Sequence, residues 1–200
     1  MAMRVVGTAK TGLIAGMGMG LLTAFGLGGR SAPAGDATAD HLDWRQVPLP
    51  GIDGQPLSSD QFLGRVVLVV NTASQCGFTR QYAELETVWR DYREVGLVVL
   101  AVPSNEFGGQ EPGNDAEIRG FCETTFGIDF PMLAKQRVTG PGAHPLYRWA
   151  AGQTGLVGLP RWNFHKLLIG RDGRLIDWFS SLTEPSGDKM RDAIFHALAD

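Results

Sequence analysis

A buried strand that leads straight into a cysteine-containing turn constrains this 200-residue chain more than any other feature. Val66–Val70 is an unbroken aliphatic run, which is typical of a strand buried on both faces of a parallel or mixed sheet. Apolar residues then recur at helical spacing, which predicts an amphipathic helix over about Thr79–Glu94. Asn71–Thr79, which contains Cys76, therefore lies at a strand-to-helix turn.

A cysteine at such a turn has two interpretations. Unpaired amide groups and the helix dipole stabilise a thiolate, which is the nucleophilic form of cysteine. The same position also suits an inert, buried cysteine in a tight turn. An ordinary thiol, with a pKa of about 8.5, is only slightly ionised at neutral pH, so a reactive Cys76 needs further hydrogen-bond donors. The turn alone leaves both interpretations open.

The first 34 residues have the layout of a secretory signal. They contain Arg4, Lys10 and Arg30 but no acidic residue, and 19 uncharged residues separate Lys10 from Arg30. With the A-x-A-like sequence at residues 32–34, this layout predicts a cleaved signal peptide and a periplasmic protein. The alternative is an uncleaved inner-membrane anchor, because 19 residues approach the ~20 that span a bilayer, although seven glycines weaken such a span.

Beyond this segment we expect a linker at residues 35–40 and one domain at residues 41–200. Without the first 34 residues, 15 of the 18 basic residues stand against 21 acidic ones, and they form no cluster that suits nucleic acid. The remaining ~165 residues are enough to bury one core. Two cysteines, Cys76 and Cys122, are too few to build a disulfide scaffold even in an oxidising compartment.

The rest of the chain reads as an α/β domain. Leu97–Val102 is a second continuous apolar strand, so strand, helix and strand imply a right-handed parallel crossover. Asn114 and Glu117 are spaced as a capping box, which begins a helix over Asn114–Thr125. The other predictions are a hairpin of Leu42–Leu49 and Gly51–Gly54, an edge segment at Phe130–Leu133, a helix at His144–Ala151, paired strands at Lys166–Ile169 and Leu175–Ser180, and a last helix after Pro185. Together they predict a mixed sheet flanked by helices, of the thioredoxin type.

Three separate segments resemble the signatures of the glutathione peroxidase family. Asn71–Thr79 is similar to the family's peroxidatic segment, Phe107–Gly113 to its glutamine loop, and Trp162–Phe164 to its third signature. They occur in the family's order and spacing, and the resemblance covers roughly His41–Leu198. The resemblance implies a thioredoxin fold and the reduction of hydroperoxides by a thiol, with no metal or other cofactor.

The resemblance also gives roles to single residues. Cys76 occupies the place of the cysteine or selenocysteine that attacks the hydroperoxide, and Cys122 matches the resolving cysteine of the thioredoxin-dependent members. Gln110, Trp162 and Asn163 occupy positions that complete a tetrad around the sulfur. Neutral amide and indole donors stabilise both a thiolate and the oxyanion that leaves as the O–O bond breaks.

Cys122 also fits a purely structural position. It lies four residues after Ile118 and next to Phe121, so its helix directs it inward, as for a small apolar residue. As the resolving thiol it attacks the sulfenic acid on Cys76, which requires the two Cα atoms to come within ~7 Å. We therefore expect the Asn114–Thr125 helix to unwind locally after Cys76 is oxidised.

Some stretches depart from the family pattern or stay ambiguous. Glu106 stands where the family usually has glutamine and adds a negative charge near the glutamine loop. The stretch between Tyr147 and Trp162 lacks the long insertion of the tetrameric animal members, which favours a monomer. Arg80 is either a source of positive field for Cys76 or an ordinary surface residue. The four histidines, His41, His144, His165 and His196, have no metal-ligand spacing.

Three other functions start from the same residues. A thiol–disulfide oxidoreductase is disfavoured because Thr79, rather than a second cysteine, stands three residues after Cys76. A peroxide-sensing relay protein forms the same sulfenic acid as a peroxidase, and a binding domain with a static disulfide uses the same two cysteines. The sequence also leaves open the preferred hydroperoxide and the reductant, either a thioredoxin-like protein or glutathione. A monomeric site near a membrane suits lipid hydroperoxides.

Overall fold

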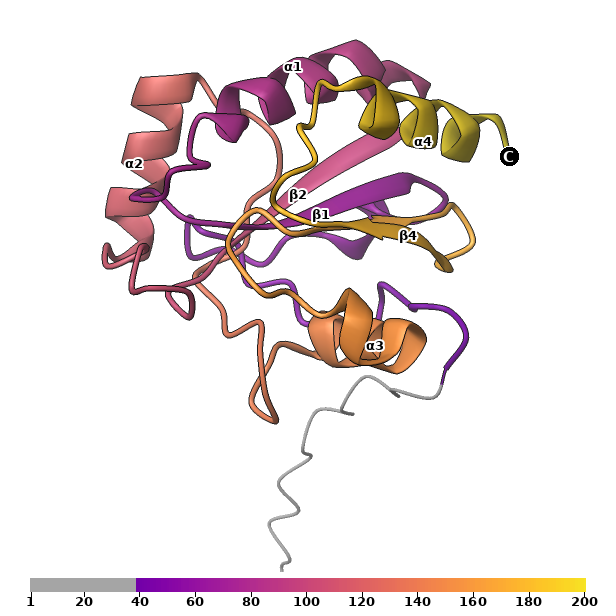
Figure 1. Cartoon of the computed structure of the whole chain (residues 1–200), viewed down its shortest axis with the longest axis horizontal. Helices are drawn as coiled ribbons and strands as arrows, with labels where there is room; N and C mark the ends of the chain where they lie inside the picture. Colours follow the sequence, from indigo (N-terminus) through magenta and orange to yellow (C-terminus); the bar gives the residue numbers. More distant parts are fainter. Residues whose placement is uncertain (1–38) are drawn as a thin grey trace, which may run out of the picture. The chain divides into compact units, whose positions relative to one another are not determined.

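A computed structural model describes residues 39–200, so the predicted signal or anchor at residues 1–34 and most of the linker lie outside the described part (Figure 1). Its centre is a four-stranded sheet in the order β2-β1-β3-β4. The strands are β1 (Val66–Thr72), β2 (Leu97–Pro103), β3 (Lys166–Ile169) and β4 (Leu175–Phe179). β1 and β2 are parallel, β3 is antiparallel to β1, and β4 is antiparallel to β3. The mixed sheet of the thioredoxin type is confirmed.

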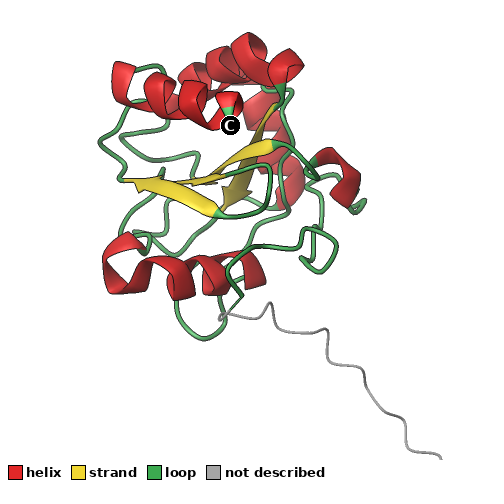
Figure 2. Ribbon diagram, turned by 90° about the vertical axis from the view of Figure 1, so that its right-hand side faces the viewer, coloured by secondary structure: helices red, strands yellow, loops and turns green. Residues whose placement is uncertain are grey.

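Helices cover both faces of this sheet (Figures 1 and 2). The helices are α1 (Gln81–Tyr92), α2 (Asp115–Phe126), α3 (Pro145–Thr154) and α4 (Asp188–Ala199). Three short 3-10 turns lie at Ser59–Gln61, Arg93–Val95 and Gly155–Gly158. Residues of α1, α2 and α4 share one buried cluster, and residues of α3 belong to a second cluster on the other face. The sheet therefore forms the middle of three layers.

The two clusters explain why β1 is apolar at every position of its first five residues. Val66, Leu68 and Val70 belong to the cluster of α1, α2 and α4, whereas Val67 and Val69 belong to the cluster of α3. Because successive strand residues point to opposite faces, a strand covered on both faces needs apolar side chains throughout. No residue of β1 is exposed.

The predicted start of α1 is two residues too early. The Thr79 hydroxyl accepts a hydrogen bond from the Cys76 amide at 2.9 Å and donates to the Ala73 carbonyl at 2.9 Å. Thr79 therefore closes the cysteine turn, and regular helix begins at Gln81. The capping box of α2 is confirmed, because the Asn114 side chain accepts from the Glu117 amide and the Glu117 carboxylate accepts from the Asn114 amide.

The hairpin predicted over Leu42–Leu49 is wrong in its extent. Pairing is reduced to one bridge between Pro50 and Pro56 and a hydrogen bond from the Leu57 amide to the Leu49 carbonyl at 2.8 Å. Prolines lack the N–H group that a longer ladder requires. By contrast, the edge prediction for Phe130–Leu133 is confirmed by a bridge between Met132 and Ala101 of β2. No helix within residues 39–200 has both the length and the apolar character of a membrane span.

Candidate active site

The residues singled out in the sequence converge because of strand direction. Cys76 follows β1, Gln110 follows β2, and Trp162 and Asn163 precede β3. The carboxyl ends of the parallel strands β1 and β2 lie at one edge of the sheet, and the amino end of the antiparallel β3 lies at the same edge. Three loops from distant parts of the chain thus meet beside one cysteine.

Cys76 is half-buried in the turn between β1 and α1. The turn is closed by the two Thr79 hydrogen bonds described above. The amide of Phe78 points at the sulfur, with its nitrogen 3.5 Å from Sγ. An amide directed at a thiol is the donor arrangement that favours a thiolate. The predicted amide contact near Cys76 is therefore present.

The glutamine loop is joined directly to both neighbouring loops. The Gln75 amide donates to the Gln110 carbonyl oxygen at 3.0 Å, which fixes the loop beside the cysteine turn. The Asn163 side-chain amide donates to Gln110 Oε1 at 2.9 Å and to the Phe107 carbonyl at 3.3 Å. Gln110 and Asn163, 53 residues apart in sequence, are therefore hydrogen-bonded to each other.

The loop itself is fixed by its own polar residues. The Asn105 side chain accepts from the Glu111 amide at 2.8 Å. The Lys135 ammonium donates to the carbonyls of Glu111 and Gly113 at 3.3 and 2.5 Å. Burial raises the pKa of the Glu111 carboxyl, which neighbouring Ser74 and Lys135 offset only in part. These contacts fix the glycine-rich backbone around Gln110.

The segment from Trp162 to Phe164 is hydrogen-bonded to Asn71 of β1. The Asn71 side-chain amide donates to the Trp162 carbonyl at 3.0 Å, and the Phe164 amide donates to the Asn71 carbonyl at 2.6 Å. The Ser181 hydroxyl donates to the Asn163 carbonyl at 2.6 Å. Asn163 is fully buried as a result, whereas the Trp162 side chain remains 40% exposed at the rim.

The sulfur of Cys76 forms no hydrogen bond with Gln110, Trp162 or Asn163 in the described part of the chain. Within residues 39–200, its hydrogen-bond donor is the Phe78 amide, and neither Gln110, Trp162 nor Asn163 donates to Cys76 Sγ. In the same part of the chain, Gln110 Nε2 and the Trp162 indole N–H make no hydrogen bond. Since Asn163 occupies Gln110 Oε1, Nε2 is the amide group that Gln110 has left to donate.

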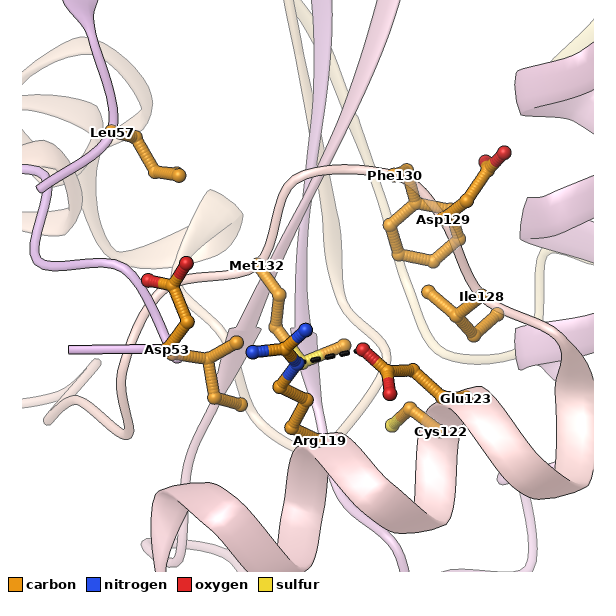
Figure 3. Close-up of a pocket in the computed structure, with 10 residues that line it drawn as sticks. Asp53, Leu57, Arg119, Cys122, Glu123, Ile128, Asp129, Phe130 and Met132 are labelled. Carbon is orange, nitrogen blue, oxygen red and sulfur yellow. Dashed lines mark hydrogen bonds and ion pairs between the residues drawn. The ribbon is translucent and has the colours of Figure 1, made fainter. Parts of the chain in front are cut away.

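Cys122 lies in a different environment, on α2 and 1% exposed. Burial raises the pKa of its thiol to about 11, and the carboxylates of Glu111 and Glu123 act in the same direction. Figure 3 shows Cys122 in the wall of a cavity of 230 Å³, where Arg119 and Glu123 form an ion pair at 2.6 Å. Cys76 and Cys122 are both free thiols, which does not support a static disulfide.

Glu106 is turned toward another segment. Its carboxylate accepts hydrogen bonds from Arg137 Nε at 2.9 Å, from the amides of Val138 and Thr139 at 2.7 Å, and from the Thr139 hydroxyl. Burial opposes the charge, but these donors lower the pKa of Glu106 below its usual value. The extra charge expected near the glutamine loop is thus neutralised by the 137–139 segment.

Arg80, His144 and His165 make contacts that explain their positions without a catalytic role. Arg80 is exposed and pairs with Glu184 at 3.4 Å, as expected of a surface residue. His144 caps α3 by accepting from the Leu146 amide, and His165 stacks on Trp178. In the part of the chain that the structure describes, no group of three or more His, Cys, Asp and Glu residues is arranged to hold a metal ion.

Sequence reasoning missed two features of the site. The first is Lys166, which is fully buried at the start of β3 and was visible only as a lysine heading an apolar strand. The second is a groove of 540 Å³ that begins at Phe78 and Trp162. The groove is lined by Phe78, by residues between 157 and 165 and by residues between 178 and 182, so no local sequence pattern could predict it.

Similarity to known proteins agrees with this geometry. The family model for glutathione peroxidase matches residues 46–151. The glutathione peroxidase-like peroxiredoxin gpx1 of Schizosaccharomyces pombe is 46% identical over 135 residues, covering 66% of this chain and 85% of that protein. The hydroperoxy fatty acid reductase Gpx2 of Synechocystis is 43% identical over 156 residues, covering 76% and 99%. The crystal structure of Trgpx in apo form has a TM-score of 0.63 at 38% identity, covering 80% and 97%.

This chain belongs to the glutathione peroxidase family. It is therefore a thiol-dependent peroxidase, an oxidoreductase that reduces hydroperoxides with the protein's own sulfur as the reacting group. A thioredoxin-family thiol:disulfide interchange protein from Chlorobium tepidum shares the fold alone, with a TM-score of 0.55 at 19% identity over 76% of this chain and 96% of that one. The fold is thus thioredoxin-like, as the sequence predicted.

Proposed function

We propose that Cys76 is the residue of this peroxidase that attacks the hydroperoxide, with Gln110 and Trp162 as donors to the reacting atoms and Asn163 as the residue that orients Gln110. The observation that carries the proposal is the hydrogen bond from Asn163 Nδ2 to Gln110 Oε1 at 2.9 Å. It joins two of the three loops beside the cysteine turn and leaves the Gln110 NH₂ group as a donor. Rotation of the Trp162 side chain, which is 40% exposed, toward the sulfur would then complete the donor set.

The first step oxidises Cys76. Its thiolate attacks one oxygen of the hydroperoxide, the S–O bond forms, and the O–O bond breaks. The second oxygen leaves as an alkoxide or hydroxide and takes up a proton, while the sulfur becomes a sulfenic acid. Neutral donors stabilise the charge on both the attacking sulfur and the leaving oxygen, and each such donor is worth about 3–4 kcal/mol when it is well placed.

The second step uses Cys122 as the resolving thiol. Its sulfur attacks the sulfenic sulfur, an S–S bond forms, the S–O bond breaks, and the hydroxyl leaves as water with the proton of Cys122. Cys122 is buried on α2, and its thiol has a pKa of about 11. The step therefore requires α2 to open, which exposes the thiol and returns its pKa toward the ordinary value.

The third step restores both thiols. A dithiol protein of the thioredoxin type attacks the Cys76–Cys122 disulfide and leaves as its own disulfide, and glutathione is the alternative electron donor. The protein acts as a monomer in this scheme. The fully buried Asn163 and the loops that hold Gln110 and Trp162 come from one chain, so the site requires no second copy.

The groove beside Trp162 points to a long-chain hydroperoxide as substrate. Its apolar lining consists of Phe78, Val157, Leu159, Trp162, Trp178 and Leu182. Arg161 also lies in the lining and offers a cation to a carboxylate or phosphate. A similar protein from Synechocystis is a hydroperoxy fatty acid reductase, which supports the same substrate class here. An exposed apolar groove of this kind also suits work close to a membrane surface.

Substitution of Leu182 by Asp tests the groove. Leu182 is 79% exposed, so an aspartate there leaves the core intact but places a charge where an acyl chain would lie. We expect the kcat/KM for a fatty acid hydroperoxide to fall at least tenfold and that for hydrogen peroxide to stay unchanged. Phe195→Asp on α4 is the matched control, since Phe195 is 63% exposed and lies outside the groove. Equal losses for both substrates would reject the groove as a substrate site.

Residues 1–34 are proposed as a cleaved signal, with residues 41–200 as the periplasmic peroxidase domain and residues 35–40 as a linker. The basic start, the apolar run and the A-x-A-like sequence support this location. Amino-terminal sequencing of the protein expressed in a bacterial host should begin after Ala34. A full-length protein in the membrane fraction would instead establish the inner-membrane anchor.

Turnover of the wild type, Cys76→Ser and Cys122→Ser with glutathione and with a thioredoxin system tests the cycle. Cys76→Ser should be inactive with either reductant, and Cys122→Ser should lose turnover with thioredoxin but retain the first reaction with peroxide. Mass analysis of peroxide-treated wild type should show a Cys76–Cys122 disulfide. A sulfinic acid on Cys76 beside a free Cys122 would reject the two-cysteine cycle, and stoichiometric consumption of peroxide would favour a sensing relay.

A further inference from the structure

Lys166 is the most unusual buried group near the site. It is 0% exposed and begins β3, where its neighbours across the sheet are Val70 of β1 and Phe179 of β4. Removing an ammonium group from water is strongly unfavourable unless hydrogen bonds compensate for the loss. A lysine in this position donates hydrogen bonds that a leucine could not provide.

The contacts of Lys166 lead to the backbone of the proposed site. Its Nζ donates to the Phe164 carbonyl at 2.8 Å and to Gln81 Oε1 at 2.6 Å. The Gln81 side-chain amide donates to the Ser181 carbonyl at 2.8 Å, and the Ser181 hydroxyl donates to the Asn163 carbonyl at 2.6 Å. Two consecutive carbonyls, those of Asn163 and Phe164, are thus held by one network that starts at the ammonium.

The backbone at this point needs such support. Phe164 has a φ of 64°, and among residues 39–200 it is the one non-glycine residue with positive φ. A left-handed conformation of a bulky residue is strained and persists only where the surroundings hold it. The turn buries the Phe164 ring and directs the Asn163 amide back onto Gln110.

We propose that Lys166 is a positioning residue of the peroxidase site: its buried ammonium holds the turn at Asn163 and Phe164, and so keeps the Asn163 amide on Gln110. The inference rests on the proposed roles of Cys76, Gln110 and Asn163. Lys166 acts through these residues and does not touch the peroxide.

The charge state of Lys166 gives the inference a testable pH dependence. Burial lowers the pKa of Lys166 to about 7, and the carboxylate of Glu84 on α1 opposes the shift. Lys189 of α4 lies 5.4 Å from the centre of the ring of Phe179, which is the cross-strand neighbour of Lys166. Burial lowers the pKa of the adjacent His165 to about 4, and the charge of Lys166 acts in the same direction. The ammonium is therefore present below pH 7 and is lost as the pH rises through that value. A neutral amine donates weaker hydrogen bonds.

The test measures the single-turnover rate constant of Cys76 with hydrogen peroxide in a Cys122→Ser background. Lys166→Met should lower it about ten- to a hundredfold, because small misplacements of donors carry losses of this size. Lys166→Arg, which keeps a cation with donors, should recover most of the rate. Leu168→Ala, two residues along the same buried face of β3, is the control for lost stability and should lower Tm without changing the rate. A Lys166→Met rate within twofold of wild type, or an equal loss in Leu168→Ala, overturns the inference.

Two further readouts separate positioning from folding. In an Asn163→Ala background, Lys166→Met should cause no additional loss of rate, since the residue through which it acts is absent, whereas multiplicative losses would overturn the inference. The rate per thiolate should fall above pH 7 in the wild type and stay level in Lys166→Arg, which remains charged; identical profiles would count against Lys166. If Cys76→Ser retains the reaction, the proposed function itself fails, which is a result distinct from all of these.

Discussion

The two cysteines of this peroxidase carry the same thiol in opposite surroundings. Cys76 is half-buried in a loop turn, with the Phe78 amide 3.5 Å from its sulfur and donors of two other loops nearby. Cys122 is 1% exposed on α2, and burial raises the pKa of its thiol to about 11. Loop ends at the edge of a sheet can direct many polar groups at one atom, whereas a helix face in the core surrounds a thiol with apolar side chains.

The contrast assigns an order to the chemistry. In the proposed cycle, the half-buried sulfur of Cys76 meets the peroxide first, and the buried sulfur of Cys122 stays unreactive until α2 opens. The stability of α2 then sets how readily the second step proceeds. Its capping box at Asn114 and Glu117 and its ion pair between Arg119 and Glu123 favour the closed helix (Figure 3).

The largest effect is expected from breaking the donor arrangement around Cys76. Gln110→Ala removes the donor that Asn163 orients, and we expect kcat/KM for hydrogen peroxide to fall about 10²–10³-fold. Stopped-flow kinetics of the reduced protein measure this directly. Gln136→Ala is a control, because the side chain of Gln136 donates to the carbonyl of Ala134 rather than to a residue of the proposed site. A Gln110→Ala variant with the wild-type rate would contradict the proposed role of Gln110.

Cys122 should be alkylated by iodoacetamide at pH 8 at least about a hundredfold more slowly than Cys76. A pKa near 11 leaves about a hundredfold less thiolate on Cys122 than an ordinary thiol has, and burial limits access further. Peptide mapping of partly alkylated protein gives both rates. The ratio should approach one in denaturant. Equal alkylation of both thiols in the native protein would show that α2 does not protect Cys122.

The same pKa shift predicts a loss of stability at high pH. Folding raises the pKa of Cys122, so its contribution is fully present below pH 9 and is lost as the pH rises toward 11. The wild type should therefore lose about 2–3 kcal/mol of unfolding free energy between these values that Cys122→Ala does not lose. Urea unfolding of both proteins at pH 8 and pH 11 supplies the comparison. If both proteins lost the same unfolding free energy, the thiol of Cys122 would ionise as readily in the folded protein as in the unfolded chain.

The smallest effect concerns the cap of α2. Asn114→Ala removes the side chain that accepts from the Glu117 amide at 3.0 Å and should destabilise the helix by about 1 kcal/mol. Opening of α2, and with it the rate of Cys76–Cys122 disulfide formation, should rise about fivefold. The reaction of Cys76 with peroxide should not change. Ser58→Ala, which removes the cap of the 3-10 turn at Ser59–Gln61 and leaves the cap of α2 intact, is the control. An unchanged disulfide rate in Asn114→Ala would mean that opening of α2 is not limiting.

Much of this arrangement is legible in local sequence. The apolar run of β1 and the spacing of Asn114 and Glu117 predicted a doubly covered strand and a capped helix, because burial and capping depend on neighbours a few residues apart. The start of α1 was missed because the Thr79 hydroxyl bonds the Ala73 carbonyl, a contact across six residues that helical periodicity does not reveal. The hairpin predicted from Leu42–Leu49 is reduced to one bridge because the paired residues Pro50 and Pro56 lack the N–H groups of a longer ladder.

The succession of strands and helices along the chain, the three segments that resemble the family signatures and the inward direction of Cys122 can all be read from the residues alone. Three contacts cannot: Asn163 donates to Gln110, the 137–139 segment neutralises Glu106, and the buried Lys166 supports the turn at Phe164. The difference is one of range. Periodicity and capping act over one or two turns of chain, whereas hydrogen bonds between loops depend on how the strand ends meet at one edge of the sheet.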